Sequence, residues 1–271
     1  MTSLPPALPP ALGVMTFNVR RRIDGMPWRR SDRWSTRHPR VVQMLRTARP
    51  TLLGLQEVMP SQGSAIAAAL GDDYSMIGRG RRADGRGEAC PVAFDHTRLQ
   101  LLSWEQRALS DEPEVPGSRT WGNLVPRIAI AARFRDLATG AEFSHVNTHL
   151  DPYSRRSQAL SAIALRELVA GFDAPTVLTG DLNAGADSPA LYEFLLGGVL
   201  RDAWDVAARR STPEWGTYTN YRAPRMGRAR LDWILVTAGI RVADIAIDAR
   251  RYGGGWPSDH LPVHALLEVT S

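Results

Sequence analysis

The chain has 271 residues, of which 44% are hydrophobic and 23% are charged, an ordinary composition for a globular protein that buries a substantial core. This length suits one large two-sheet domain and is short for two independent domains. No apolar run approaches the ~18–20 residues that a membrane span needs, so we expect no transmembrane segment.

The net charge of +5 is compatible with an anionic substrate, but it is a weak indication of nucleic-acid binding. All 33 basic residues are Arg and none is Lys, which indicates a genome-wide coding bias rather than a tuned binding surface. Arginine runs such as 20–22 and 209–210 are therefore interpreted as solvated faces. The single cysteine, Cys90, excludes an internal disulfide and makes a reducing cytoplasm the expected location.

Residues 1–12 are predicted to be a disordered N-terminal segment and not a signal peptide. It has no basic residue before its apolar residues, and prolines interrupt them. No internal repeat and no linker rich in Gly, Ser or Pro divides the remainder. We therefore expect residues 13–271 to form a single domain.

Along the chain, short runs with β-branched or aromatic residues predict strands, and longer periodic patterns predict a few helices between them. The expected strands are Val14–Val19, Thr51–Leu55, Tyr74–Ile77, Pro91–Phe94, Arg127–Phe134, Phe143–Thr148, Thr176–Thr179, Leu231–Val236, Ile240–Ile247 and Pro262–Val269. The expected helices are His38–Arg49, Ser61–Leu70, Ser157–Gly171 and Ser188–Leu196. Strands on both sides of each helix, without strict alternation, favour two stacked sheets with helices outside.

Polar residues follow the apolar strands at six places, where a two-sheet core delivers side chains to its rim. Asn18 closes the first strand, and its amide either orients a carboxylate, a water or a phosphate oxygen, or caps a turn. Glu57 ends the second strand, where a lone carboxylate is adequate for Mg²⁺ and a surface glutamate is the alternative. His149 follows a later strand, either as a proton donor or phosphoryl contact or as a structural histidine.

The strongest of these signals follows the apolar strand that ends near Thr179. Asp181 and Asn183 are two residues apart and can face the same side. An acid that takes or orients a water proton, beside an amide that holds a phosphate, suits hydrolysis. A plain Asp-x-Asn turn is the alternative.

The last two places are expected to form a pair. Asp232 lies inside an apolar strand, which is costly unless the carboxylate is hydrogen-bonded, and Asp259 and His260 precede the final strand. A pair of Asp232 and His260 would satisfy the acid and fix the imidazole tautomer. No competing constellation is found: there is no Walker loop, glycine fingerprint or zinc spacing, and Cys90 has no partner for a thiol nucleophile.

This ordered set resembles the endonuclease/exonuclease/phosphatase superfamily. The motifs that carry the resemblance are Phe17-Asn18, Leu55-Gln56-Glu57, Thr148-His149-Leu150, Gly180-Asp181-Leu182-Asn183, Arg230-Leu231-Asp232 and Ser258-Asp259-His260. They span nearly the whole chain, and six short motifs in the right order make coincidence improbable. The resemblance implies an α/β fold, a four-layer α/β/β/α sandwich in which two mostly antiparallel sheets pack face to face with helices outside.

The resemblance also implies a metal site. Glu57 would be the principal ligand of Mg²⁺ or Mn²⁺, and Asn18 and Asp259 would also serve that site. Asn18 would hold phosphate oxygens as well. The family does not decide whether one or two ions act.

The same resemblance implies the chemical roles of the remaining residues. Asp181 would activate the attacking water, and Asn183 would hold phosphate oxygens. His260, oriented by Asp232, would contact the scissile phosphate. His149 would stabilise the developing charge or protonate the leaving oxygen, in an in-line attack on phosphorus.

Within the superfamily, the chain is most similar to small bacterial hydrolases. The matching features are Trp34, Gly87-Glu88, Pro116-Gly117-Ser118, Trp121 and Arg127. Arg127 opens a strand and is either a contact to the substrate phosphate or an ordinary surface arginine. Pro152 stands where those hydrolases commonly have His, which leaves the role of its loop open.

The first functional hypothesis is a divalent-metal-dependent phosphodiesterase or phosphatase acting on a small or lipid-linked phosphorylated substrate. The alternative is an endonuclease or exonuclease acting on DNA or RNA, because several tryptophans fall in predicted loops near arginines. They are Trp28, Trp34, Trp121, Trp215 and Trp256. A catalytically inactive binding module is less favoured, because no member of the acid–amide–imidazole set is missing.

Overall fold

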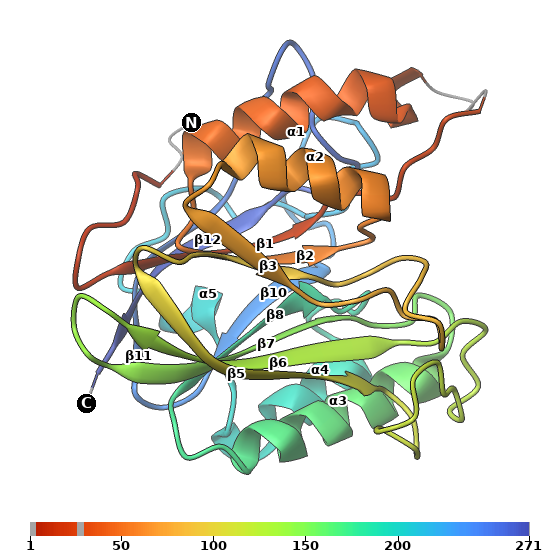
Figure 1. The fold of residues 1–271 in the computed structure, drawn as a ribbon, viewed down its shortest axis with the longest axis vertical. Coiled ribbons are helices and arrows are strands. Elements are labelled where there is room, and N and C mark those ends of the chain that lie inside the picture. The colour runs from red at the N-terminus through yellow and green to blue at the C-terminus, as the bar shows by residue number, and fades with distance from the viewer. Residues whose placement is uncertain (1–3, 26–29, 271) are drawn as a thin grey trace.

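Two six-stranded sheets form the centre of the computed structural model, which describes residues 4–25 and 30–270 (Figure 1). The first sheet contains β1 (Leu12–Asn18), β2 (Leu52–Gln56), β3 (Tyr74–Ile77), β4 (Val92–Asp95), β11 (Ile240–Ile247) and β12 (Val263–Val269). The second contains β5 (Leu99–Ala108), β6 (Ile128–Asp136), β7 (Glu142–His149), β8 (Thr176–Asp181), β9 (Arg201–Asp202) and β10 (Asp232–Val236). Their orders are β11-β12-β1-β2-β4-β3 and β5-β6-β7-β8-β10-β9.

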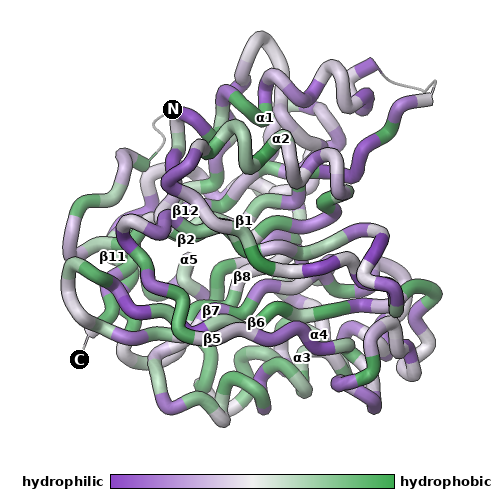
Figure 2. Tube along the Cα trace, in the orientation of Figure 1, coloured by the Kyte–Doolittle hydropathy of each residue, from purple (hydrophilic) through white to green (hydrophobic). Residues whose placement is uncertain are grey.

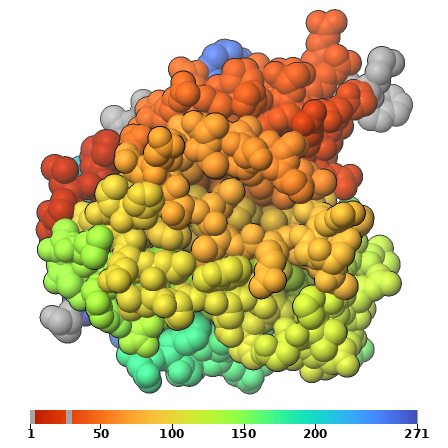
Figure 3. Space-filling view, in the orientation of Figure 1, coloured from red at the N-terminus to blue at the C-terminus, as the bar shows by residue number. Residues whose placement is uncertain are grey.

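Helices cover the outer face of each sheet, which gives four layers (Figure 1). The helices of the described residues are α1 (Trp34–Ala48), α2 (Pro60–Leu70), α3 (Arg155–Ala170), α4 (Pro189–Leu195) and α5 (Ala203–Val206), with the 3-10 turns η1 (Arg30–Asp32) and η2 (Leu196–Gly198). The α1–α2 layer lies at one side of the molecule and α3 at the opposite side, as the space-filling view also shows (Figure 3). The predicted four-layer sandwich is confirmed.

Three apolar clusters lie between these layers, because alternate residues of each strand face opposite sides. Along β2, Leu52 packs between the two sheets, whereas Leu53 packs with Met44 of α1. On the other side, Leu178 of β8 packs with Leu165 of α3. Figure 2 shows hydrophobic stretches along the central strands of both sheets. This double burial explains why the strands read as nearly continuous apolar runs.

All ten predicted strands and four predicted helices are present, with ends shifted by a few residues. The helix expected at His38 begins at Trp34, so Pro39 lies inside α1, where it removes one backbone hydrogen bond. The strands β5 and β9 and the short helix α5 were not predicted. β5 is an edge strand with mostly exposed or half-buried residues, so its sequence lacks an apolar run.

Part of the N-terminal segment packs against the rest of the molecule. Residues 1–3 of the segment predicted to be disordered lie outside the described residues, whereas Leu4 is buried and β1 begins at Leu12. Between them, residues 5–11 form neither helix nor strand. None of the helices in the described ranges combines the length and apolar character that a bilayer-crossing segment requires.

A buried polar network joins the two sheets directly beneath their polar rim. Asn147 Oδ1 of β7 accepts hydrogen bonds from Gln56 Nε2 (2.9 Å) and Thr179 Oγ1 (3.0 Å). The Thr179 hydroxyl also lies 2.8 Å from His145 Nε2. Gly54 faces this network, and a Cβ added there would lie 2.2 Å from Thr179 Oγ1 and 2.5 Å from Asn147 Oδ1. Glycine is therefore required at this point of β2.

Gly54→Ala is expected to destabilise the protein, because the new methyl group must displace Asn147 and Thr179 from their hydrogen bonds. Overpacking of this kind costs about 1–3 kcal/mol, which corresponds to a fall of several degrees in Tm. Thermal unfolding followed by circular dichroism measures the change. Gly25→Ala is the matched control, since a Cβ at Gly25 meets nothing within 4 Å. Equal Tm values for the two variants would show that the network tolerates the methyl group.

Candidate active site

The six polar motifs meet at one edge of the sandwich because of the strand topology. Each sheet has one parallel pair, β1–β2 in the first and β7–β8 in the second, and the other neighbours are antiparallel. The carboxyl ends of these pairs carry Asn18 with Gln56, and His149 with Asp181. Asp232, the first residue of the antiparallel strand β10, pairs in register with Asp181. Residues far apart in the chain therefore share one rim.

Asn18 connects the two sheets at this rim. Its Nδ2 donates to Asp181 Oδ2 (2.8 Å) and to Glu57 Oε1 (3.1 Å). Its Oδ1 accepts from the backbone N–H of Arg20 (2.9 Å). One amide nitrogen thus bridges the two carboxylates and orients them. The amide oxygen is turned toward the backbone of Arg20 instead.

Glu57 is held in an unusual backbone conformation, with φ of 60° in the left-handed region. Its Oε2 accepts from the backbone N–H of Arg21 (2.9 Å). Burial would raise the pKa of the Glu57 carboxyl, but His149, the Arg21 N–H, the Asn18 amide and Arg20 lower it to about 2. Glu57 is therefore a carboxylate at neutral pH.

A positive charge already lies beside the predicted metal ligands. The guanidinium of Arg20 is 3.8 Å from Glu57 Oε2 and 3.6 Å from Asp259 Oδ2. Glu57 and Asp259 are both largely buried, and their carboxylates converge on this one cation. Carboxylate oxygens are also the donors that Mg²⁺ and Mn²⁺ prefer. The donor set therefore fits a hard divalent ion.

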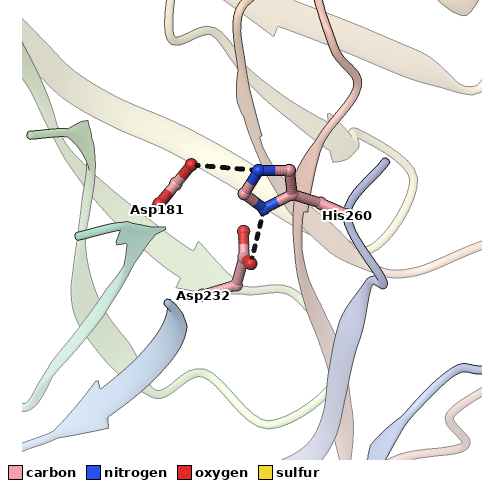
Figure 4. A group of neighbouring side chains, drawn as sticks. All are labelled: Asp181, Asp232 and His260. Atoms are coloured by element: carbon pink, nitrogen blue, oxygen red, sulfur yellow. Dashed lines mark hydrogen bonds and ion pairs between the residues drawn. The ribbon is translucent and has the colours of Figure 1, made fainter. Parts of the chain in front are cut away.

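Asp232 and His260 form the predicted pair, and Asp181 lies on the other side of the imidazole (Figure 4). His260 Nδ1 is 2.8 Å from Asp232 Oδ2, and Nε2 is 3.7 Å from Asp181 Oδ2. Ligand atoms of these three buried residues lie within 4.8 Å of one another. Burial alone would lower the pKa of His260, but Asp232 and Asp181 raise it well above its usual value. The two acids on either side of the ring therefore favour its imidazolium form.

Asp181 is almost completely buried at the centre of the rim. Its Oδ1 accepts from the backbone N–H of Asn183 (2.9 Å), and its Oδ2 lies 3.6 Å from His149 Nε2. Burial, and then the charge of Asp232, raise the pKa of Asp181. A carboxylate with a raised pKa is a stronger base, which suits the removal of a proton from water.

His149 and Asn183 complete the set expected from the sequence. Burial lowers the pKa of His149 to about 4, so its ring is neutral at pH 7. Asn183 is half-buried with φ of 48°, and one N–H of its amide donates to the carbonyl of Leu150 (3.0 Å). Within the described residues, the second N–H of that amide has no acceptor. A phosphate contact of Asn183 stays a prediction.

Arg127 is not a surface residue. It is 5% exposed, and its Nε lies 3.3 Å from Asp151 Oδ2. It lines a small cavity together with Glu57 and His149, which places it at the same rim. Asp151 Oδ1 also accepts the backbone N–H of Tyr153 (2.9 Å), so the loop that contains Pro152 is fixed by Asp151.

Three residues of the site were missed by sequence reasoning. Arg20 was assigned to a solvated run, but its backbone is left-handed (φ 56°) and its guanidinium lies beside Glu57 and Asp259, the predicted metal ligands. Gln56 and Asn147 stand within or beside the motifs, but their network depends on sheet packing. Cys90 behaves as expected, because burial raises its pKa to about 12 and leaves no reactive thiolate.

Comparison with known proteins agrees with this geometry. The model of the Endonuclease/Exonuclease/phosphatase family matches residues 15–260. "Protein angel" of Drosophila melanogaster is 27% identical over 175 residues, which cover 60% of this chain and 47% of that protein. Nocturnin of the same organism is 30% identical over 117 residues, 41% of this chain and 16% of that protein. The chain thus spans less than half the length of either curated relative.

Solved structures match over nearly the whole chain. A mannosyl-6-phosphatase of Bacteroides thetaiotaomicron is 29% identical with a TM-score of 0.86, over 94% of this chain and 99% of that one. An endonuclease/exonuclease/phosphatase of Bacteroides vulgatus is 30% identical with a TM-score of 0.87, over 96% of this chain and 99% of that one. The human Nocturnin catalytic domain shares the fold at 18% identity and a TM-score of 0.71, over 96% and 94%. The chain belongs to the Endonuclease/Exonuclease/phosphatase family.

Proposed function

We propose that this protein is a divalent-metal-dependent hydrolase that cleaves a phosphoester bond of a small phosphorylated substrate by in-line attack of water. The observation that carries the proposal is the convergence of Glu57, Asp181 and His260, from three distant segments, through the Asn18 amide and the imidazole contacts. The family consists of hydrolases, and the similar mannosyl-6-phosphatase supports a phosphatase acting on a small molecule. Lipid-linked phosphates and diesters belong to the same proposal.

Glu57 and Asp259 would hold the metal, for which we propose Mg²⁺ or Mn²⁺, with Asn18 orienting the ligands. When bound, the ion polarises a phosphoryl oxygen and neutralises the charge that develops on it. Asp181, fixed by Asn18 and by the N–H of Asn183, would take the proton of the attacking water.

The two histidines would act at opposite protonation states. The imidazolium of His260, oriented by Asp232, would donate a hydrogen bond from Nε2 to a phosphate oxygen as that oxygen gains charge. His149 is neutral, so it would stabilise charge on the leaving oxygen by hydrogen bonding. Arg127 borders the cavity of Glu57 and His149 and would add a positive field there.

Of the five tryptophans on which the nuclease alternative rested, the four that the structure describes do not form an exposed stacking surface. Trp34 and Trp121 are buried, and Trp215 and Trp256 pack partly buried against the core between the sheets. Trp28 lies outside the described residues. A nuclease therefore gains no specific support from these residues, and a location in the cytoplasm stays a prediction from the single cysteine.

The direct test is a hydrolysis panel with Mg²⁺ and Mn²⁺. We expect turnover of p-nitrophenyl phosphate, bis-p-nitrophenyl phosphate or a sugar 6-phosphate. Cutting of plasmid DNA and single-stranded oligonucleotides, without hydrolysis of the small esters, would establish the nuclease instead. Absence of turnover on every substrate would favour an inactive binding module.

Glu57→Gln is expected to weaken metal dependence, because the variant replaces a charged ligand with a neutral amide. The metal concentration for half-maximal activity should rise on the order of tenfold to a hundredfold. The enzyme is dialysed against a chelator and titrated with Mg²⁺ or Mn²⁺, and calorimetry reports metal binding without turnover. Glu167→Gln, on the exposed face of α3, is the control. Equal titration curves would remove Glu57 from the metal site.

A further inference from the structure

A cavity of about 360 Å³ adjoins the candidate active site and takes no part in the chemistry proposed above. It is formed by the loop between α5 and β10, and its lining includes Tyr218, Arg222, Arg225, Arg228 and Leu231. Concave surfaces of this size bind small ligands or parts of them. The kind of ligand that would bind there can be inferred from the position, the charge and the rigidity of the cavity.

The cavity lies beside His260, the histidine of the proposed mechanism. The backbone of Tyr218 pairs with that of His260, and the two ring centroids are 5.1 Å apart. The next residue, Thr219, donates its backbone N–H to the carbonyl of Asp259 (2.8 Å). At the other end of the loop, Leu231 immediately precedes Asp232. The cavity therefore lies next to His260, on the side of Tyr218.

The lining is strongly positive. Arg222, Arg225 and Arg228 are exposed, and among the residues that the structure describes no Asp or Glu lines the cavity. Within the described residues, no hydrogen bond or ion pair engages the three guanidinium groups. By contrast, Arg230, next to them in the chain, is buried and ion-paired with Asp202. Three like charges gathered without acids in a concave surface focus a field that attracts an anion.

The shape of the cavity is set before any ligand binds. The loop folds back on itself, with a bridge between Trp215 and Met226 and a hydrogen bond from the Gly216 N–H to the Arg225 carbonyl (3.1 Å). Gly216 packs so closely against the backbone of Arg228 that an added Cβ would lie 2.4 Å from the Arg228 Cβ. The Tyr221 hydroxyl ties the loop to η1 by donating to Asp32 Oδ1 (2.8 Å).

We propose that this arginine cavity binds a second phosphate group of the substrate, so that the enzyme prefers small molecules that carry a further phosphate beyond the scissile ester. A guanidinium group binds phosphate with two parallel N–H···O hydrogen bonds, and three guanidinium groups can share one doubly charged phosphate. A small molecule is favoured over nucleic acid because the charge is gathered in one cavity and the four described tryptophans of the predicted loops are buried or half-buried. The inference rests on the proposed phosphoester hydrolysis.

The test compares one substrate with a single phosphate and one with two. Kinetic constants for p-nitrophenyl phosphate and for glucose 1,6-bisphosphate are measured with excess Mg²⁺ in wild type and in the triple variant Arg222→Gln/Arg225→Gln/Arg228→Gln. In the triple variant, the KM for glucose 1,6-bisphosphate should rise roughly tenfold or more, while kcat and KM for p-nitrophenyl phosphate stay unchanged. The three single variants Arg222→Gln, Arg225→Gln and Arg228→Gln are measured as well, and Arg46→Gln, which removes an exposed charge on α1, is their matched control.

Calorimetric binding of glucose 1,6-bisphosphate to wild type and triple variant separates this inference from the proposed function. Tighter binding to wild type supports the cavity even if neither ester is hydrolysed, a result that would defeat only the proposed reaction. Equal binding to both proteins, or an equal change for the two substrates, would overturn the inference. A loss confined to single-stranded oligonucleotide binding would also overturn it, in favour of a nucleic-acid contact.

Discussion

Asp181→Asn is expected to lower kcat by about 10²–10⁴-fold, the usual contribution of a positioned general base. The Asp181 carboxylate contacts the first sheet through Asn18 Nδ2 at 2.8 Å, and it lies 3.6 Å from the imidazole of His149 and 3.7 Å from that of His260. The amide retains an oxygen that accepts from Asn18, but it cannot take a proton from water. The effect should therefore fall on kcat more than on KM.

Steady-state kinetics and thermal unfolding of the same preparation check this result. The fold should be kept, because burial raises the pKa of Asp181 and a neutral side chain removes a charge that the interior disfavours. Asp187→Asn, an exposed change in the following loop, is the matched control and should leave kcat unaltered. Activity of Asp181→Asn within a few-fold of wild type would show that another group activates the water.

His260→Ala is expected to lower kcat by a comparable factor and, unlike Asp181→Asn, to lower stability as well. His260 is the partner of Asp232, which is fully buried and whose Oδ1 has no hydrogen bond within the described residues. Removal of the imidazolium leaves that carboxylate buried without its counter-charge. Breaking a buried pair in this way costs about 3–5 kcal/mol.

The double variant His260→Ala/Asp232→Asn separates the two effects. A neutral amide in place of Asp232 should restore much of the Tm, whereas activity should stay low because the phosphate contact is still missing. His96→Ala, at an exposed position, is the control. Activity that recovers together with stability would assign His260 a purely structural role.

Much of the fold is readable from periodicity. Strands such as β8, buried on both faces, carry continuous apolar runs, and α3 has a clear apolar stripe, so both were predicted within two residues. The edge strand β5 was missed because its residues face solvent and carry no such pattern. Edge position is a property of the assembled sheet, which local sequence does not encode.

The site shows the same division. Asp181, His260 and Glu57 were found because each polar residue interrupts or ends an apolar strand, a signal that is local in sequence. Arg20 was interpreted as solvated because a run of arginines carries no mark of a buried partner. Its place between Glu57 and Asp259 depends on contacts across 37 and 239 positions of the chain. No local pattern contains that information.

The amino-acid sequence by itself determined which residues are able to do chemistry and at which strand ends they stand. Only the tertiary structure decided which of them touch, that Asn18 joins two acids, and that three exposed arginines line one cavity beside His260. The physical reason is that apolar periodicity sets each strand and its faces, whereas contacts between distant segments follow from sheet order and register. In this fold, two parallel pairs and their antiparallel neighbours bring those ends to one rim.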